Sequence, residues 1–119
     1  HQLNNLVAFV DVNDLQISGP TAEVMNMEPI ADKFAAFGWT VCTIDGNDMS
    51  NIVLALDDTP LSSSAPTAII ARTIKAKGIR HLEGTAGSHY WKPSAAELDA
   101  AEDELRQQLS TIAGKVGTH

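Results

Sequence analysis

Residues 6–21, LVAFVDVNDLQISGPT, contain the pattern that decides the fold. Leu6 to Val10 is an apolar, partly β-branched run, which is typical of a strand buried on both faces of a sheet. The run ends in the polar stretch DVND, and Ser18 to Thr21 then turns the chain. Open α/β sheets bind ligands beyond the carboxyl ends of their strands, and the side-chain oxygen of Asn13 is a hard donor suited to Mg²⁺ or Ca²⁺. The stretch therefore predicts a metal or phosphate site directly after the first strand.

Two more strands and two helices follow along the chain. Thr40 to Ile44 is rich in β-branched residues, and Thr67 to Ala71 is a second apolar run, so both are predicted strands. Apolar residues at helical spacing predict helices from Met27 to Phe37 and from Asp48 to Leu56. The alternation of strands and helices predicts an α/β fold with a parallel sheet and right-handed crossovers.

The last third of the chain has a different character. Lys75 to Lys92 has no clear period and contains three glycines, which predicts a long loop, and long loops in compact domains are often functional. Ser94 and Glu97 form a capping box that opens a final helix from Ala95 to about Ala113. The apolar stripe of this helix consists of Leu98, Ala101, Leu105, Leu109 and Ile112.

Composition limits the class of protein. At 119 residues the chain is at most one small domain, and its 44% hydrophobic content is enough for a core. The net charge of −7 disfavours nonspecific nucleic-acid binding, and no stretch is apolar enough to span a membrane. The single cysteine, Cys42, excludes an internal disulfide and a cysteine-built zinc site; we expect a buried structural thiol in a reducing, cytoplasmic protein.

Three segments resemble the thiamine-diphosphate-binding half of transketolases. Leu6 to Gly19 resembles the family pattern LIAxVDxNGLQIDG, Ile44 to Asp48 resembles IDGHD, and Ile69 to Gly78 resembles IIAKTxKGKG. The resemblance implies a partial thiamine-diphosphate-binding fold, a three-layer α/β structure with helices on both faces of a parallel sheet. Residues of this chain that depart from the family patterns are Asp14 for glycine, Asn47 for histidine, Arg72 for lysine and Ala76 for glycine.

The resemblance also implies metal ligands. Asn13 falls on the asparagine whose side-chain oxygen binds the divalent cation, and Leu15 on the residue that gives the cation its backbone carbonyl. The family's third ligand, an aspartate in a Gly-Asp-Gly triplet well upstream, has no counterpart here, so we expect residues 1–119 to be a fragment of one domain that lacks this part. From the residues alone, the favoured interpretation is that Asn13 only supports the turn. Asn47 or Asp48 is expected to cap the next helix.

His89 is the predicted catalytic residue and a third cofactor contact. It lies close to where the family places a histidine beside the cofactor diphosphate and the substrate, although Tyr90 follows it where the family has glycine. An imidazole there donates to phosphate and moves protons near neutral pH. His81 in the same loop is a competitor, and a solvated histidine is the plain alternative. Lys75 and Lys77 are candidates for phosphate contact, with solvated lysines as the alternative.

The function that the resemblance implies is that of a cytoplasmic transketolase of pentose phosphate metabolism. The resemblance implies that thiamine diphosphate is held through Mg²⁺, with Ca²⁺ as the alternative ion. The implied reaction is the transfer of a two-carbon ketol unit from a ketose phosphate to an aldose phosphate. The implied partner is a pyrimidine-binding domain or the C-terminal subunit of a split transketolase, in a homodimer or heterotetramer. The alternatives are another thiamine-diphosphate enzyme, such as deoxyxylulose-phosphate synthase, or a non-catalytic domain of the same fold. We expect the isolated 119 residues to be inactive.

Overall fold

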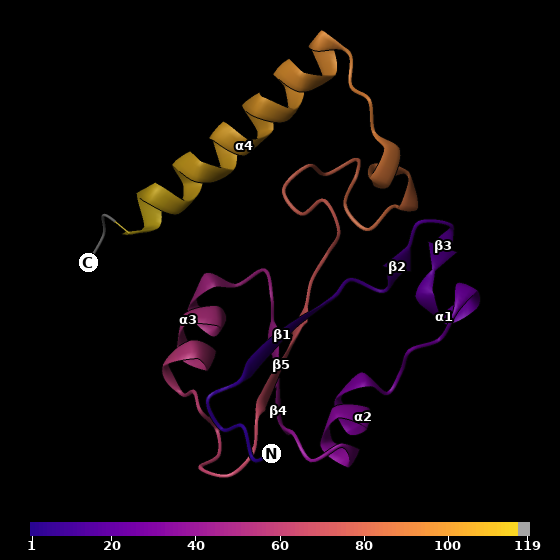
Figure 1. Ribbon diagram of the computed structural model, residues 1–119. Coiled ribbons are helices and arrows are strands. Elements are labelled where there is room, and N and C mark those ends of the chain that lie inside the picture. Colours follow the sequence, from indigo (N-terminus) through magenta and orange to yellow (C-terminus); the bar gives the residue numbers. More distant parts are fainter. Residues whose placement is uncertain (117–119) are drawn as a thin grey trace. The chain divides into compact units, whose positions relative to one another are not determined.

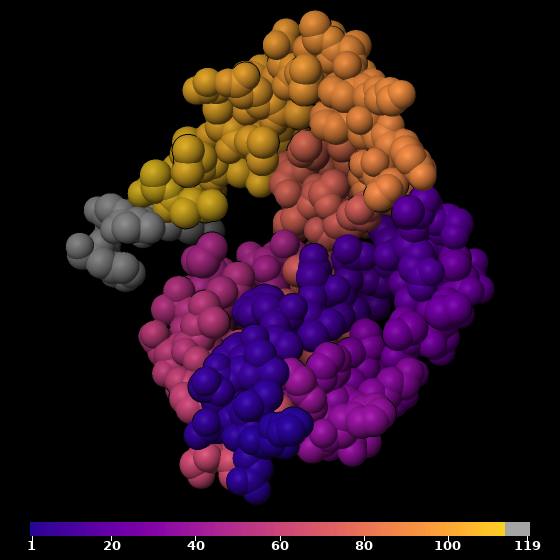
Figure 2. Space-filling model, viewed as in Figure 1, coloured from indigo at the N-terminus to yellow at the C-terminus, as the bar shows by residue number. Residues whose placement is uncertain are grey.

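The computed structural model describes residues 1–116, with the side chains of residues 1–113. The chain divides into a first unit, residues 1–74, and a second unit that begins at Lys75 (Figures 1 and 2). The elements of the first unit are β1 (Val7–Val12), β2 (Leu15–Gln16), β3 (Gly19–Pro20), α1 (Thr21–Val24), α2 (Ile30–Ala36), β4 (Thr40–Asp45), α3 (Met49–Asp57) and β5 (Thr67–Arg72). The second unit contains the 3₁₀ helix η1 (Ala86–Tyr90) and α4 (Ala95–Val116).

A three-stranded parallel sheet organises the first unit. Its order is β1-β5-β4, so the strand that comes last in sequence lies in the middle. Helices α2 and α3 cover opposite faces of this sheet (Figure 1). On the α2 face, Ala68 and Ile70 of β5 join Val12 in a buried cluster, against which Ile30 and Phe34 of α2 pack. The prediction of an α/β fold with helices on both faces of a parallel sheet is confirmed.

The prediction that the first strand is buried on both faces is wrong. Strand β1 lies at one edge of the described sheet, and its residues alternate between exposed and partly covered up to Val12, which is buried. Val7 and Phe9 are exposed, and indigo atoms of the N-terminal segment lie on the surface of the first unit in Figure 2. The strand with both faces covered is β5, in which Thr67 to Ala71 are buried. An apolar run cannot distinguish these cases, because sheet position depends on the order of strands.

Several local predictions differ only at their boundaries. Helix α2 begins at Ile30 rather than Met27, because Pro29 occupies the N-cap and disfavours helical backbone in the residue before it. Helix α3 begins after Asp48, whose carboxylate accepts from the Ser50 amide at 2.8 Å, a bond that lowers the pKa of Asp48.

Cys42 is half-buried rather than buried, since β4 is the other edge strand of the described sheet. Its partial burial nevertheless raises the pKa of its thiol.

The second unit contains the predicted loop and final helix. The loop includes one short element, η1, and otherwise consists of turns and irregular backbone. The capping box is confirmed, because the Ser94 amide donates to Glu97 at 2.7 Å and the Glu97 amide donates back to the Ser94 hydroxyl. In the apolar stripe of α4, Ala101 is buried whereas Leu98, Leu105, Leu109 and Ile112 are exposed. No helix in the described part of the chain has the length and hydropathy needed to cross a membrane.

Gly46 is required where β4 meets the end of β5. Its amide donates to the carbonyl of Arg72 at 2.7 Å. A Cβ at this position would lie 2.6 Å from Cγ2 of Thr73 and 2.8 Å from Cβ of Ala71. Both neighbours are short side chains on a strand end, so the backbone itself would have to move.

We therefore expect Gly46→Ala to lower the free energy of unfolding by about 1–3 kcal/mol, the usual cost of overpacking. The measurement is the denaturant midpoint of the whole protein that contains these residues. Gly87→Ala is the matched control, because nothing lies within 4 Å of a Cβ built there. Equal midpoints for the Gly46→Ala variant and the unmodified protein would contradict the packing argument.

Candidate functional site

The carboxyl ends of the three parallel strands form one polar edge. The last residues of β1, β5 and β4 are partners in the strand register: Val12 pairs with Arg72, and Arg72 pairs with Asp45. The three following loops therefore begin side by side, as expected for a ligand-binding edge of an open α/β sheet. We call the residues that follow these strands, 13–15, 46–48 and 73–74, the carboxyl edge.

Hydrogen bonds join the loops of the carboxyl edge. The Thr73 amide donates to the Val12 carbonyl at 3.0 Å, and its hydroxyl donates to the carboxylate of Asp11. The amide of Ile74 donates to Oδ1 of Asn47 at 2.7 Å. Asn47 thus fixes the chain after β5, whereas Asp48 is the helix cap. No local pattern indicates this role of Asn47, because its partner lies 27 residues further on.

Asn13 forms the turn that follows β1. Its Oδ1 accepts from the Leu15 amide at 3.1 Å, which is an Asx turn. Asp14 has a φ of +58°, the left-handed conformation that glycine adopts easily and that aspartate tolerates better than most residues. The Asp14 carbonyl accepts from Thr21 at 2.8 Å, which holds the short β2–β3 hairpin against the turn. The supporting role of Asn13 is thereby observed, and its role as a ligand stays a prediction.

The donor atoms of this turn are suitable for a small divalent cation. Asn13 is half-buried, and its Oδ1 has a second lone pair beside the one that faces Leu15. A cavity of about 340 Å³ is lined by this turn, with Ile30 and Phe34 of α2 on its apolar side. Mg²⁺ prefers six oxygens and usually shares them among protein, phosphates and water. The amide oxygen of Asn13 and the backbone carbonyl of Leu15 are thus of the donor type that a magnesium ion takes, with the remaining oxygens to be supplied from elsewhere.

The described residues contain no cluster of three or more His, Cys, Asp or Glu side chains placed to hold a metal by themselves. A preformed zinc-type site is thus absent from this part of the chain. A magnesium site built from an amide, a carbonyl and the oxygens of a ligand does not require such a cluster.

A three-residue charge cluster lies next to the turn. Nη1 of Arg72 is 2.5 Å from Oε1 of Glu28 and 3.4 Å from Oδ1 of Asp14. The hydrogen bond between Arg72 and Glu28 lowers the pKa of the Glu28 carboxyl and raises that of the guanidinium. The backbone amide of Ile30 also donates to Glu28, at 3.0 Å. We call Asp14, Glu28 and Arg72 the charge cluster; sequence reasoning missed it because its members lie far apart in the sequence.

The histidine candidates belong to the second unit. His89 lies in η1, is exposed, and its ring contacts that of Tyr90 edge-on at 4.7 Å. His81 is also exposed, with its ring 5.7 Å from that of Trp91. The role of His89 beside a cofactor diphosphate and substrate stays a prediction.

The two lysine candidates lie in the turn that opens the second unit. Lys77 Nζ is 3.4 Å from the carboxylate of Glu83, which also accepts from the Gly78 amide at 2.9 Å. Gly78 has a φ of +105°, and Ala76 has a φ of +58° where the family pattern has glycine. The contact with Glu83 favours a structural role for Lys77 over contact with a phosphate.

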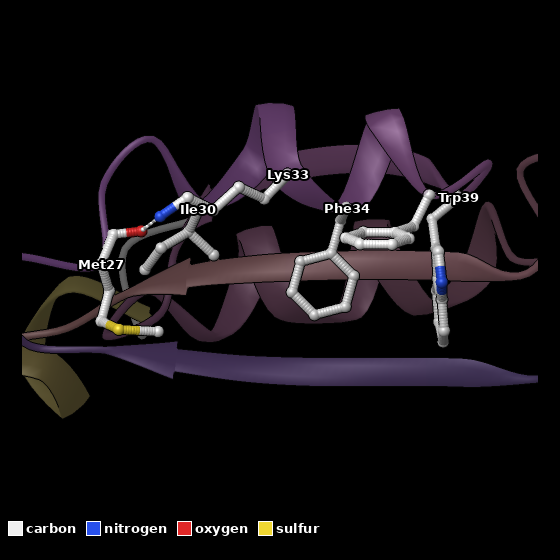
Figure 3. A pocket seen from close by; sticks show the side chains of 6 residues that line it. Met27, Ile30, Lys33, Phe34 and Trp39 are labelled. Carbon is white, nitrogen blue, oxygen red and sulfur yellow. Dashed lines mark hydrogen bonds between the residues drawn. The ribbon is translucent and has the colours of Figure 1, made fainter.

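A second groove of the first unit has an almost wholly apolar lining. It has a volume of about 310 Å³ and is lined by Met27, Ile30, Lys33, Phe34, Phe37 and Trp39 (Figure 3). The rings of Phe34 and Trp39 meet edge-on at 5.4 Å, and the Lys33 ammonium donates to the Met27 carbonyl at 2.8 Å. Such an apolar lining does not suit a phosphate, so the carboxyl edge is the better candidate for a diphosphate site.

Comparisons with known proteins agree with the motifs. The family described as "Transketolase, thiamine diphosphate binding domain" matches residues 1–111. A Phocaeicola vulgatus protein, named as one of the subunits of an apulose-4-phosphate transketolase, is 36% identical over 112 residues, which cover 94% of this chain and 40% of that protein. A Clostridium protein, named as one of the subunits of a 6-deoxy-6-sulfo-D-fructose transketolase, is 40% identical, with coverage of 82% and 38%. The human protein named transketolase is 30% identical, with coverage of 97% and 18%.

The structural comparison gives the same result. The crystal structure of transketolase from Campylobacter jejuni matches with a TM-score of 0.68 at 26% identity, over 99% of this chain and 22% of that one. The chain spans 40% or less of the length of the curated relatives named above.

Proposed function

Because the chain belongs to the transketolase family, through that family's thiamine diphosphate binding domain, we propose that it holds the cofactor's diphosphate at its carboxyl edge through Mg²⁺. The observation that supports this most directly is the Asx turn of Asn13, which places an amide oxygen and the Leu15 segment directly after β1. Asn13 Oδ1 and the Leu15 carbonyl are the proposed ligands of the ion, with Ca²⁺ as a substitute.

The proposed reaction is the transfer of a two-carbon ketol unit from a ketose phosphate to an aldose phosphate. Bound thiamine diphosphate would supply the nucleophilic carbon for this chemistry, while the protein supplies position and electrostatics. In this proposal His89 donates a hydrogen bond to the diphosphate or substrate and moves a proton near neutral pH. The relatives whose names carry sugar phosphates or sugar derivatives support this substrate class.

We propose that residues 1–119 are one part of a larger catalytic assembly. The relatives are more than twice as long, and two of them are named as subunits of transketolases. The third protein ligand of the ion would then lie outside this sequence. The same holds for the pyrimidine-binding domain or C-terminal subunit with which these residues would form a homodimer or heterotetramer. A cytoplasmic location stays a prediction, based on a single cysteine.

The proposal is tested by calorimetric titration of thiamine diphosphate into the whole protein. We expect binding with Mg²⁺ present and a large loss of affinity when a chelator removes it, because the ion held by Asn13 and Leu15 would supply the positive charge that attracts the diphosphate. Ketol transfer by the loaded protein with its partner, from a ketose phosphate to an aldose phosphate, is the second measurement. Binding that is indifferent to the metal would contradict the proposed site.

The same assay separates the alternatives. A deoxyxylulose-phosphate synthase would use a different donor and acceptor with the same cofactor. A non-catalytic domain of this fold would show neither reaction, even with its partner present and the cofactor supplied in excess.

A further inference from the structure

We propose that Arg72 is a positioning residue of the diphosphate site, which neutralises Asp14 and Glu28 so that an anionic ligand can approach the carboxyl edge. This inference rests on the proposed function, because the diphosphate of the cofactor is the anion concerned. It assigns a role to two residues, Asp14 and Arg72, at which this chain departs from the family patterns.

The first step concerns where the carboxylates lie. Asp14 stands between the two proposed ligand residues and lines the 340 Å³ cavity together with them. It also lines a neighbouring cavity of about 170 Å³, to which Glu28 contributes. A glycine at position 14 would bring no charge, so the aspartate adds a negative group at the place where a diphosphate is proposed to bind.

The second step concerns how the charges are balanced. One guanidinium nitrogen of Arg72, Nη1, contacts both carboxylates, at 2.5 Å from Glu28 and 3.4 Å from Asp14. Arg72 ends β5, whose register is fixed on both sides by β1 and β4, so its backbone is held firmly. The charge cluster has a net charge of −1, and without Arg72 it would have a net charge of −2 in a chain that is already acidic.

The third step concerns the size of the effect. The side chains are partly exposed, at 39% for Arg72, 40% for Glu28 and 74% for Asp14, so water and salt screen their fields. Ion pairs of this kind add little to folding stability. A diphosphate carries several negative charges, however, so a change of one charge beside it acts on binding more than on folding.

The test measures the dissociation constant of thiamine diphosphate in the whole protein at saturating Mg²⁺, at low and at high ionic strength. We expect Arg72→Ala to weaken binding about five- to tenfold at low salt, and by less at high salt. Arg72→Lys keeps the positive charge and should bind as the unmodified protein does. Arg106→Ala is the matched control, since Arg106 pairs with Glu102 within α4 of the second unit.

A second set of variants separates charge from structure. Adding Asp14→Asn and Glu28→Gln to Arg72→Ala should restore affinity at least to that of the unmodified protein, because the net charge of the cluster then changes from −2 to 0, compared with −1 in the unmodified protein. Asp14→Asn and Glu28→Gln with Arg72 intact should tighten binding, and this pair does not depend on the folding of an Arg72 variant. Thermal unfolding of each protein without cofactor monitors its folding.

Three results would overturn the inference. The first is equal affinity of Arg72→Ala and the unmodified protein for the cofactor at low salt. The second is a loss of affinity in Arg72→Ala that the triple variant does not correct. The third is a loss of affinity that is the same at low and at high ionic strength. Failure of the unmodified protein to bind the cofactor through Mg²⁺ would instead refute the proposed function.

Discussion

Asn13→Ala is expected to abolish most of the Mg²⁺-dependent affinity for thiamine diphosphate. The substitution removes one proposed oxygen ligand and also the acceptor for the Leu15 amide, whose carbonyl is the other proposed ligand. Loss of a residue that only orients a metal ligand typically costs about 10- to 100-fold in affinity. Loss of a ligand together with the orientation of the next one should cost at least as much. The measurement is a calorimetric titration of cofactor at several Mg²⁺ concentrations.

Two controls make this experiment specific. Asn13→Ser keeps an oxygen that can accept from the amide two residues on, so it preserves much of the turn while shortening the reach toward an ion. Asn51→Ala removes another asparagine of the first unit, one that donates to Asp48 within its own helix end. We expect binding to fall for Asn13→Ser and to be unchanged for Asn51→Ala. Unchanged affinity of Asn13→Ala at every metal concentration would remove Asn13 from the site.

His89→Ala is expected to have the other large effect, on turnover. A positioned general acid or base contributes about 10²- to 10⁴-fold to a rate, so kcat should fall within this range while the cofactor still binds. His89 is exposed and its ring meets that of Tyr90 edge-on, so its loss should leave folding nearly unchanged. The measurement is the rate of ketol transfer by the whole protein and its partner, with the cofactor dissociation constant determined in parallel.

His81→Ala is the matched control for this variant. His81 is another exposed histidine of the same loop, with its ring against Trp91. If His81→Ala removed turnover and His89→Ala did not, the assignment of the two histidines would have to be exchanged. If neither substitution changed the rate, the loop would have no acid–base role.

Local patterns predicted the elements of the fold because their causes are local. The cap of α3 at Asp48 and the capping box of Ser94 and Glu97 depend on residues within three positions of each other. The burial of β1 was predicted wrongly because it depends on which strand takes the centre of the sheet. That place belongs to β5, more than fifty residues further along the chain.

The candidate site shows the same division. The Asx turn of Asn13 involves residues two apart, so its position could be predicted, as could a polar edge after the strand. The bond from Ile74 to Asn47 and the contact of Arg72 with Asp14 join separate loops. They follow only from the register that aligns the three strand ends, and no spacing along the sequence indicates them.

Two turns have a non-glycine residue in the left-handed conformation at positions where the family patterns have glycine. Asp14 and Ala76 both have a φ of +58°, at positions where the family patterns have glycine. For an L-residue with a Cβ this conformation costs roughly 1–2 kcal/mol. Their positive φ values indicate that the surrounding contacts determine the backbone there more strongly than the residue type does.

The central place of β5 also has a consequence for synthesis on the ribosome. Since β1 and β4 each pair with β5 and not with one another, the three-stranded sheet cannot begin to form until Thr67 to Arg72 have emerged. A nascent chain that stops before Thr67 carries both of these strands without their shared neighbour, and unpaired strand edges favour aggregation. Translation through β5 is therefore the step at which β1 and β4 gain the strand that both of them pair with.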